Sequence, residues 1–198
     1  MKSTLIGMPL ALLLVATAGA QASPVSNLGA TNSEASSGSV SRTVASSGPV
    51  KVGQKAPTFA GWTTEGQMLG LRSLLEPAGG KATGEQKGPL IVSFFATWCE
   101  PCKEGLPVIA EVERETGARV VLVAFGERSE VVQPWLAQQG LQLTTIVDPY
   151  RKISERWGVD KALPRTFVLR ADGKVRTIFT VEGADFRDAL RAAVKAAK

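Results

Sequence analysis

The sequence predicts an α/β fold, with a mixed central β-sheet flanked by helices on both faces, and three observations predict it. Short apolar runs bounded by turn residues, such as 90–95 (LIVSFF), are typical of buried central strands. Segments with helical apolar spacing alternate with these runs. The turn sequence 171–174 (ADGK) predicts a β-hairpin near the C-terminus. Strands that alternate with helices and end in a hairpin indicate one mixed sheet covered on both sides.

The elements are expected in a definite order along the chain. Residues 52–59 form an extended leading segment, 71–75 a short apolar patch, and 76–88 a polar, glycine-rich loop. Strands are expected at 90–95, 118–125, 144–147, 166–169 and 175–181. Helices are expected at 101–116 with Pro107 inside, from Ser129 as the cap to Gln139, from Asp148-Pro149 to Trp157, and from about Asp185 onward.

The N-terminal fifty residues are not expected to join this fold. Residues 1–22 have a basic start, an apolar run and an A-x-A site, which is the layout of a secretory signal peptide; an uncleaved anchor is the alternative. Residues 23–50 are rich in Ser, Gly and Ala and are expected to be a disordered linker, because they bury too little apolar surface to offset ordering. The folded domain is then 51–198, exported to the periplasm or the outer face of the cytoplasmic membrane.

Composition excludes several classes of function. The net charge of +5 is mild and spread along 198 residues, and no aromatic–basic pattern favours nucleic-acid binding. Histidine is absent, so no His-based triad or His metal ligand is available. With two cysteines and no histidine, a structural zinc site within one chain is disfavoured, because four N and S ligands are usual. We expect no metal and no cofactor.

The two cysteines, Cys99 and Cys102, lie where the predicted strand at 90–95 meets the next helix. They can close a small disulfide and reopen it. Such a bridge encloses almost no loop, so it constrains the unfolded chain very little. A chemical role is therefore favoured, in which the pair takes or gives two electrons through a mixed disulfide.

From Val50 to its C-terminus the chain resembles the thioredoxin superfamily, and within it the exported TlpA/ResA-like thiol–disulfide oxidoreductases. The resemblance rests on the leading segment GQKAPTF (53–59), on FFATWCEPCK (94–103), on Pro107 and on LPRTFVL (163–169). A lone C-x-x-C would be weak support, since zinc sites also contain it. The string W-C-x-P-C after a β-run, followed by a second proline loop and a hairpin, is far more specific.

The resemblance implies roles for the residues around the cysteine pair. Cys99 would be the attacking thiol, and a helix N-terminus would stabilise its thiolate. Cys102, one turn into the helix, would be more buried and would resolve the mixed disulfide. Trp98 would lie beside the site and limit access to it, or would simply pack in the core. Glu100 and Pro101 would tune the redox potential, although proline at a helix start is also ordinary.

A second loop completes the implied site. The resemblance places a cis proline at Pro164, opposite the cysteines, so that the backbone of Leu163 can pair with an extended substrate peptide. The alternative is a trans proline that begins a strand. Arg165 either adds positive potential near Cys99 or faces solvent.

Two positions depart from the family pattern. Many thioredoxins carry a buried acid six residues before the first cysteine, where this chain has Ser93, and many TlpA/ResA-like proteins carry Glu at the position of Gly105. Glu104 is adjacent, but one helical residue is about 100° of rotation, so it is expected to point elsewhere. A buried carboxylate raises nearby thiol pKa values. Without one, we expect a more stable Cys99 thiolate and a more oxidising pair.

The sequence therefore favours an exported thiol–disulfide oxidoreductase that acts on protein substrates and is re-reduced by a membrane electron donor. The resemblance suggests cytochrome c maturation or general disulfide reduction. A peroxiredoxin-like thiol peroxidase is disfavoured, because Ala96 stands where such enzymes need a threonine. A copper-carrying module would want a histidine. A thioredoxin-fold adaptor without turnover is the remaining alternative.

Overall fold

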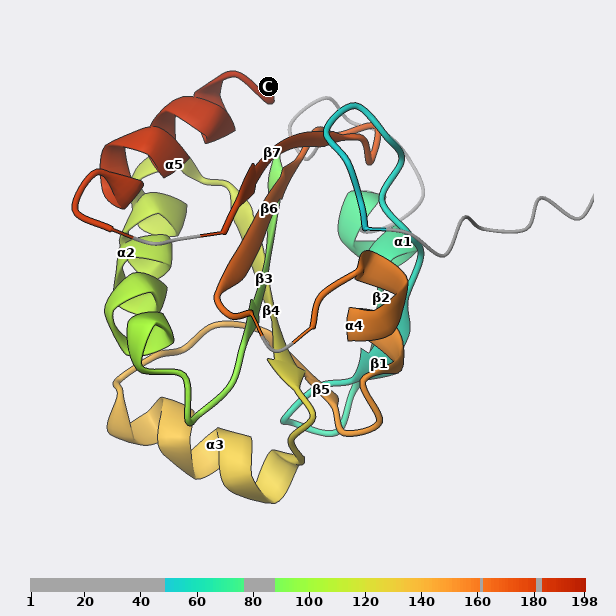
Figure 1. Ribbon diagram of the computed structural model, residues 1–198, viewed down its shortest axis with the longest axis vertical. Coiled ribbons are helices and arrows are strands. Elements are labelled where there is room, and N and C mark those ends of the chain that lie inside the picture. Colours follow the sequence, from blue (N-terminus) through green and yellow to red (C-terminus); the bar gives the residue numbers. More distant parts are fainter. Residues whose placement is uncertain (1–48, 77–87, 161, 181–182) are drawn as a thin grey trace, which may run out of the picture. The chain divides into compact units, whose positions relative to one another are not determined.

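The computed structural model describes residues 49–76, 88–160, 162–180 and 183–198. The predicted signal peptide and nearly all of the predicted linker lie outside these residues, as does most of the polar loop after residue 76. The described part forms a five-stranded mixed sheet in the order β5-β4-β3-β6-β7, with helices on both faces (Figure 1). The predicted fold class is confirmed.

Most of the predicted elements are present, with small shifts at their ends. The strands of the central sheet are β3 (Leu90–Phe95), β4 (Arg119–Phe125), β5 (Thr145–Asp148), β6 (Arg165–Leu169) and β7 (Val175–Phe179). The helices are α1 (Leu71–Leu75), α2 (Glu100–Thr116), α3 (Ser129–Gln138), α4 (Lys152–Trp157) and α5 (Phe186–Lys195). A separate antiparallel hairpin joins β1 (Ala60–Trp62) to β2 (Met68–Gly70).

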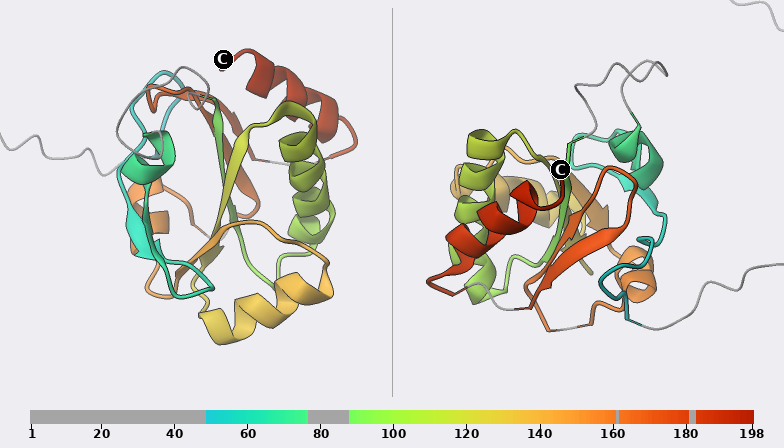
Figure 2. Two further views of the ribbon diagram at one scale, coloured as in Figure 1. Left: turned by 180° about the vertical axis from the view of Figure 1, so that it is seen from behind. Right: turned by 90° about the horizontal axis from the view of Figure 1, so that it is seen from above.

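The central strand β3 determines where the functional region lies. It pairs in parallel with β4 and antiparallel with β6, and all six of its residues are buried. Helices α2 and α5 cover one face of the sheet, while α1, α4 and the β1–β2 hairpin lie on the other (Figures 1 and 2). Successive residues of a strand point to opposite faces, so β3 contributes to two separate core layers.

The two layers differ in their side chains. One layer contains Phe94, Trp157 and Phe167, whose rings contact one another with centroids 4.9–5.8 Å apart, and we call it the aromatic face. The other layer is mostly aliphatic and includes both cysteines, and we call it the cysteine face. Helices α2 and α5 pack together on the cysteine face.

The structure differs from the sequence-based expectations at four points. The β1–β2 hairpin and the helix α1 were not predicted. Ser129 begins α3 but does not cap it, because its hydroxyl donates to the carbonyl of Thr64 instead (3.1 Å). Asp148-Pro149 does not open α4 directly, since Asp148 ends β5 and the helix begins at Lys152. The Asp148 carboxylate nevertheless accepts hydrogen bonds from the N–H groups of Ile153 and Ser154.

One arginine connects the start of the sheet to the neighbouring loop. The guanidinium of Arg119, the first residue of β4, donates to the carbonyls of Leu74 and Gly88. Burial lowers the pKa of this guanidinium. Across the described ranges, no helix combines the length and the apolar character needed to span a membrane.

Candidate active site

The cysteine pair lies where β3 passes into α2. A disulfide joins Cys99 to Cys102, whose Cα atoms are 5.3 Å apart. Cys99 is the N-cap of α2, with Glu100 and Pro101 as the first two residues of the helix. The N–H of Cys102 donates to the carbonyl of Cys99 (3.1 Å), which closes the first turn. The bond that the two thiols were expected to form is therefore present at a helix N-terminus.

The two sulfur-bearing residues differ in exposure in the way that their implied roles require. Cys99 keeps 4% of its surface exposed and Cys102 keeps none. A partner that reaches the disulfide from outside therefore meets Cys99 first. Because unpaired N–H groups and the helix dipole converge on the N-terminus of α2, this end favours negative charge on a Cys99 thiolate.

The side chains next to the cysteines are largely at the surface. Trp98 is 58% exposed, so the alternative of core packing is wrong for this residue. Glu100 forms a surface ion pair with Lys103 (2.6 Å). Pro101 is exposed as well. The residues next to the disulfide thus include a solvent-exposed indole, from Trp98, and the surface ion pair of Glu100 with Lys103.

The second loop of the implied site adjoins the first. The Leu163–Pro164 peptide bond is cis, as the resemblance implies. In the antiparallel register Phe94 pairs with Arg165, so Pro164 precedes β6 at the edge of the sheet where β3 ends and leads to Cys99. Leu163 is half-buried and packs against both core layers.

Arg165 does not simply face solvent. Its residue is half-buried, and its Nε is enclosed without a hydrogen-bond acceptor among the described residues. It stands directly after the cis proline. A cationic side chain therefore belongs to the loop next to the disulfide.

A hydrogen bond between two hydroxyl groups occupies the position of the missing buried acid. The Ser93 and Thr166 oxygens are 2.7 Å apart and fully buried between β3 and β6. Gly105 is buried in α2, and Glu104 is exposed, in agreement with the expectation that it points elsewhere. A neutral contact therefore lies on the face of β3 that also carries the cysteines, because Ser93 alternates with Ile91 and Phe95 of that layer.

Sequence reasoning missed one acidic residue at this site. Glu127 follows β4 and binds Thr97, two residues before Cys99, through both of its carboxylate oxygens. The available indication was an acid directly after Gly126, at the end of a buried strand expected beside 90–95. Its partner could not be read from the sequence, because thirty positions separate the two residues.

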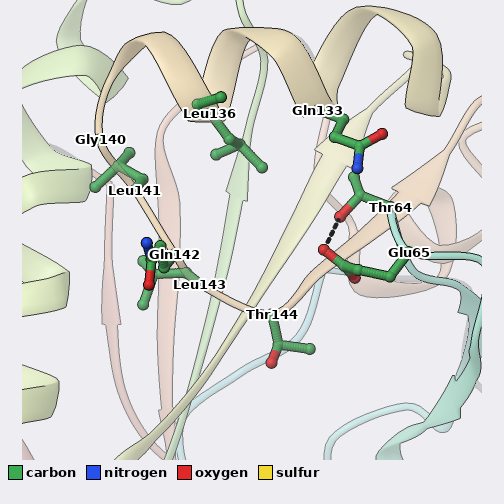
Figure 3. Close-up of a pocket in the computed structure, with 10 residues that line it drawn as sticks. Thr64, Glu65, Gln133, Leu136, Gly140, Leu141, Gln142, Leu143 and Thr144 are labelled. Carbon is green, nitrogen blue, oxygen red and sulfur yellow. Dashed lines mark hydrogen bonds between the residues drawn. The ribbon is translucent and has the colours of Figure 1, made fainter.

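No other described feature competes with the cysteine pair as a redox centre. Within the part of the chain that the structure describes, no group of three His, Cys, Asp or Glu side chains is placed to hold a metal ion. An open pocket of about 500 Å³ lies between α3 and the segment 140–144 (Figure 3). Neither cysteine lines it, so it is separate from the disulfide.

Comparisons with known proteins place the chain in a family. The AhpC/TSA family model matches residues 52–178. The thiol-disulfide oxidoreductase ResA of Bacillus thuringiensis (strain Al Hakam) is 29% identical over 129 residues, covering 64% of this chain and 68% of that protein. ResA of Bacillus subtilis (strain 168) is 28% identical over 134 residues, covering 66% of this chain and 68% of that protein.

A solved structure shows the same fold. The thiol:disulfide interchange protein, thioredoxin family protein, from Chlorobium tepidum TLS has a TM-score of 0.59 at 24% identity, covering 74% of this chain and 97% of that one. Because the family match extends over most of the described residues and includes both cysteines, the chain belongs to the AhpC/TSA family, within the thioredoxin superfamily.

Proposed function

We propose that the protein is an exported thiol–disulfide oxidoreductase that exchanges its Cys99–Cys102 pair with protein substrates. The observation that carries the proposal is the disulfide at the N-terminus of α2. The relatives named ResA, with their thiol-disulfide oxidoreductase activity, support the same class of reaction.

The exchange proceeds in two balanced steps. The Cys99 thiolate attacks one sulfur of a substrate disulfide; a Cys99–substrate S–S bond forms, the substrate bond breaks, and the released thiolate takes a proton. Cys102, as a thiolate, then attacks the sulfur of Cys99 and releases the second substrate sulfur as a thiol. Two electrons pass from the pair to the substrate, and the Cys99–Cys102 disulfide remains.

The loop around Pro164 supports a binding role in this reaction. Because it adjoins the end of β3, a substrate segment held there would lie against the exposed edge of Cys99. The backbone of Leu163 would pair with that segment as an added strand, and Arg165 would contact it. Trp98, open to solvent, would contact the partner from the other side.

The cellular setting is also part of the proposal. Residues 1–22 would direct export, so that the domain works in the periplasm or at the outer face of the membrane. Residues 23–50 would be a linker that lets the folded domain reach partners at or near that membrane. A membrane electron donor would re-reduce the disulfide. Cytochrome c maturation or general disulfide reduction is the pathway that the family resemblance favours.

Insulin reduction tests the activity. The reduced domain should cleave insulin disulfides, and Cys99→Ser should abolish this activity, since no thiol remains at the more accessible of the two positions. Equal rates for the two proteins would favour an adaptor without turnover. Cys102→Ser should accumulate mixed disulfides with its substrates, because the resolving thiol is missing, and thereby identify them.

The reduction potential of the pair gives the direction of electron flow. A value near that of thioredoxin, about −270 mV, would mark a reductant, and one near −120 mV an oxidant. A peroxidase is disfavoured on the site itself, because Ala96 supplies no hydroxyl at the position where such enzymes need a threonine. Peroxide consumption that survives Cys102→Ser would contradict this exclusion.

A further inference from the structure

Glu127 differs from the other acidic side chains near the disulfide in what it binds. Glu100 is held by a lysine on its own helix, at the surface. Glu127 is half-buried, and both of its oxygens bind Thr97: Oε2 accepts from the backbone N–H (2.8 Å) and Oε1 accepts from the hydroxyl (2.6 Å). Hydrogen bonds to an ionised carboxylate are about twice as strong as those between neutral groups.

The fold explains how two residues thirty positions apart come into contact. Strands β3 and β4 run in parallel, with Phe95 paired to Ala124, so their carboxyl ends meet at the same edge of the sheet. Gly126 then turns the chain in a left-handed conformation (φ +72°), and its N–H donates to the carbonyl of Asp148 (3.0 Å). The next residue, Glu127, is thereby placed on a backbone that is fixed to both β4 and β5.

Thr97 belongs to the short connection that carries Cys99. The N–H of Cys99 donates to the carbonyl of Ala96 (3.0 Å), so residues 96–99 form a tight turn between β3 and α2. The Glu127 contact fixes this turn from the loop that follows β4. The connection that carries Cys99 is thus held between the first turn of α2 and a carboxylate in a neighbouring loop.

We propose that Glu127 is a positioning residue for the redox reaction, whose carboxylate holds Thr97 so that the sulfur of Cys99 stays within reach of Cys102. This inference rests on the proposed function. Orienting two reacting groups raises their effective concentration, and for two thiols this quantity sets both the rate of ring closure and the stability of the disulfide. Loss of the contact should therefore weaken the Cys99–Cys102 bond relative to the free thiols.

The strength of the contact depends on the charge of the carboxylate. Glutamine could still accept from the Thr97 N–H through its carbonyl oxygen and donate its NH₂ group to the Thr97 hydroxyl oxygen, because a hydroxyl is both donor and acceptor. Glu127→Gln therefore replaces two charge-assisted hydrogen bonds by weaker neutral ones with little change in side-chain volume. Thr97→Val removes the hydroxyl and keeps the N–H, whereas Thr97→Ser keeps both donors.

The equilibrium with glutathione measures the effect directly. In this reaction the reduced protein and oxidised glutathione give the protein disulfide and two molecules of reduced glutathione. For Glu127→Gln in the full-length protein we expect the equilibrium constant to fall about tenfold, which is a shift of about 30 mV toward a more oxidising pair. The equilibrium constant of Thr97→Val should also fall, but by less, and that of Thr97→Ser should equal the wild-type value.

Two results would overturn the proposal. One is an equilibrium constant for Glu127→Gln that equals the wild-type value. The other is an equilibrium constant for Thr97→Ser that falls as far as that of Glu127→Gln. Urea unfolding of the oxidised and reduced forms provides the structural control, because a purely structural contact would destabilise both forms equally and leave the glutathione equilibrium unchanged. Glutathione needs no protein substrate, so a wild-type protein that fails to reduce insulin would contradict the proposed function while this comparison still tests Glu127.

Discussion

The aromatic face and the cysteine face of the sheet are built from the same strands but differ in chemistry. On the aromatic face, Trp157 contacts the rings of Phe59, Phe94 and Phe167. On the cysteine face, the buried side chains are mostly aliphatic, and the alternation of β3 and β6 points the hydroxyl pair of Ser93 and Thr166 to this face. One face carries a cluster of four contacting rings, and the other carries both sulfur atoms.

The difference separates stability from reactivity. Large rings bury the most area and tolerate the least rearrangement, so the aromatic face should account for much of the free energy of folding. The cysteine face carries the disulfide, which opens and closes in the proposed reaction. Substitutions in the two core layers should therefore affect different measurements. The first three of the following four predictions test this division, and the fourth concerns the helices that cover the cysteine face; they are given in decreasing order of expected effect.

Trp157→Ala should cause the largest loss of stability. Its side chain is fully buried among three phenylalanines, and large-to-small substitutions of this kind cost about 3–5 kcal/mol. Urea unfolding measures the loss, with Trp62→Ala, at a side chain 56% exposed, as the matched control. An equal loss in the two variants would contradict the role given to the aromatic face.

Asp148→Asn should lower the stability of the protein by weakening the contact between the end of β5 and the start of α4 on the aromatic face. The carboxylate accepts from the N–H groups of Ile153 and Ser154 and from the Ser154 hydroxyl, at 2.7–3.2 Å. An amide nitrogen would oppose these donors, so we expect a loss of about 1.5–3 kcal/mol by urea unfolding. Asp185→Asn is the control, because this exposed aspartate makes no side-chain cap bond. Equal unfolding midpoints would exclude the contact as a source of stability.

Ser93→Asp tests the cysteine face through reactivity. It places a carboxyl group at the buried position where many relatives have one, and like-charge repulsion then disfavours a thiolate nearby. Alkylation of the reduced protein should reach its half-maximal rate at a higher pH than in Ser93→Asn, which has the same shape without the charge. Identical pH profiles would mean that the missing acid does not explain the reactivity of the pair.

Glu115→Gln should have the smallest effect, visible only in its pH dependence. Hydrogen bonds from Arg187 and Arg191 of α5 hold the pKa of Glu115 on α2 below its usual value of 4.5. A lowered folded pKa adds stability above pH 4.5, and this stability is lost as the pH falls through the folded value. The melting temperature of the variant should lie below that of wild type at pH 7 and match it in strong acid.

The control for this last prediction is Glu104→Gln, on the exposed side of the same helix. It should change the melting temperature at pH 7 by less than Glu115→Gln does. Added salt should reduce the Glu115 effect, because the charges involved are at the surface. If the difference in melting temperature between Glu115→Gln and wild type grew as the pH fell, the expected direction of the pH dependence would be wrong.

Elements whose sequence pattern depends on near neighbours were predicted well. The apolar run of β3 and the helix after Cys99 lie where expected, because strand burial and helical spacing are local properties. The β1–β2 hairpin was missed because its strands have three residues each, too few to show an alternation. Ser129 was assigned as a cap because its alternative partner, the carbonyl of Thr64, lies on a distant segment.

The candidate active site could also be predicted only where it depends on residues close in sequence or on the family resemblance. The pairing of Cys99 with Cys102 followed from their spacing, and the cis bond before Pro164 followed from the family resemblance. The Glu127 contact depends on the parallel pairing of β3 with β4, and a single sequence does not reveal which strands are neighbours. Long-range polar contacts were therefore the part that sequence reasoning could not supply.

Arg119 has a practical consequence for labelling the protein. Its guanidinium binds the carbonyls of Leu74 and Gly88, which flank the segment 77–87, so the two ends of that segment are joined independently of what lies between them. The entropic cost of a longer loop grows only slowly with its length once its ends are fixed. Gly88 leads into the start of β3, and the cysteines follow the opposite end of that strand. An epitope tag or a fluorophore-bearing insert placed within 77–87 should leave disulfide exchange intact.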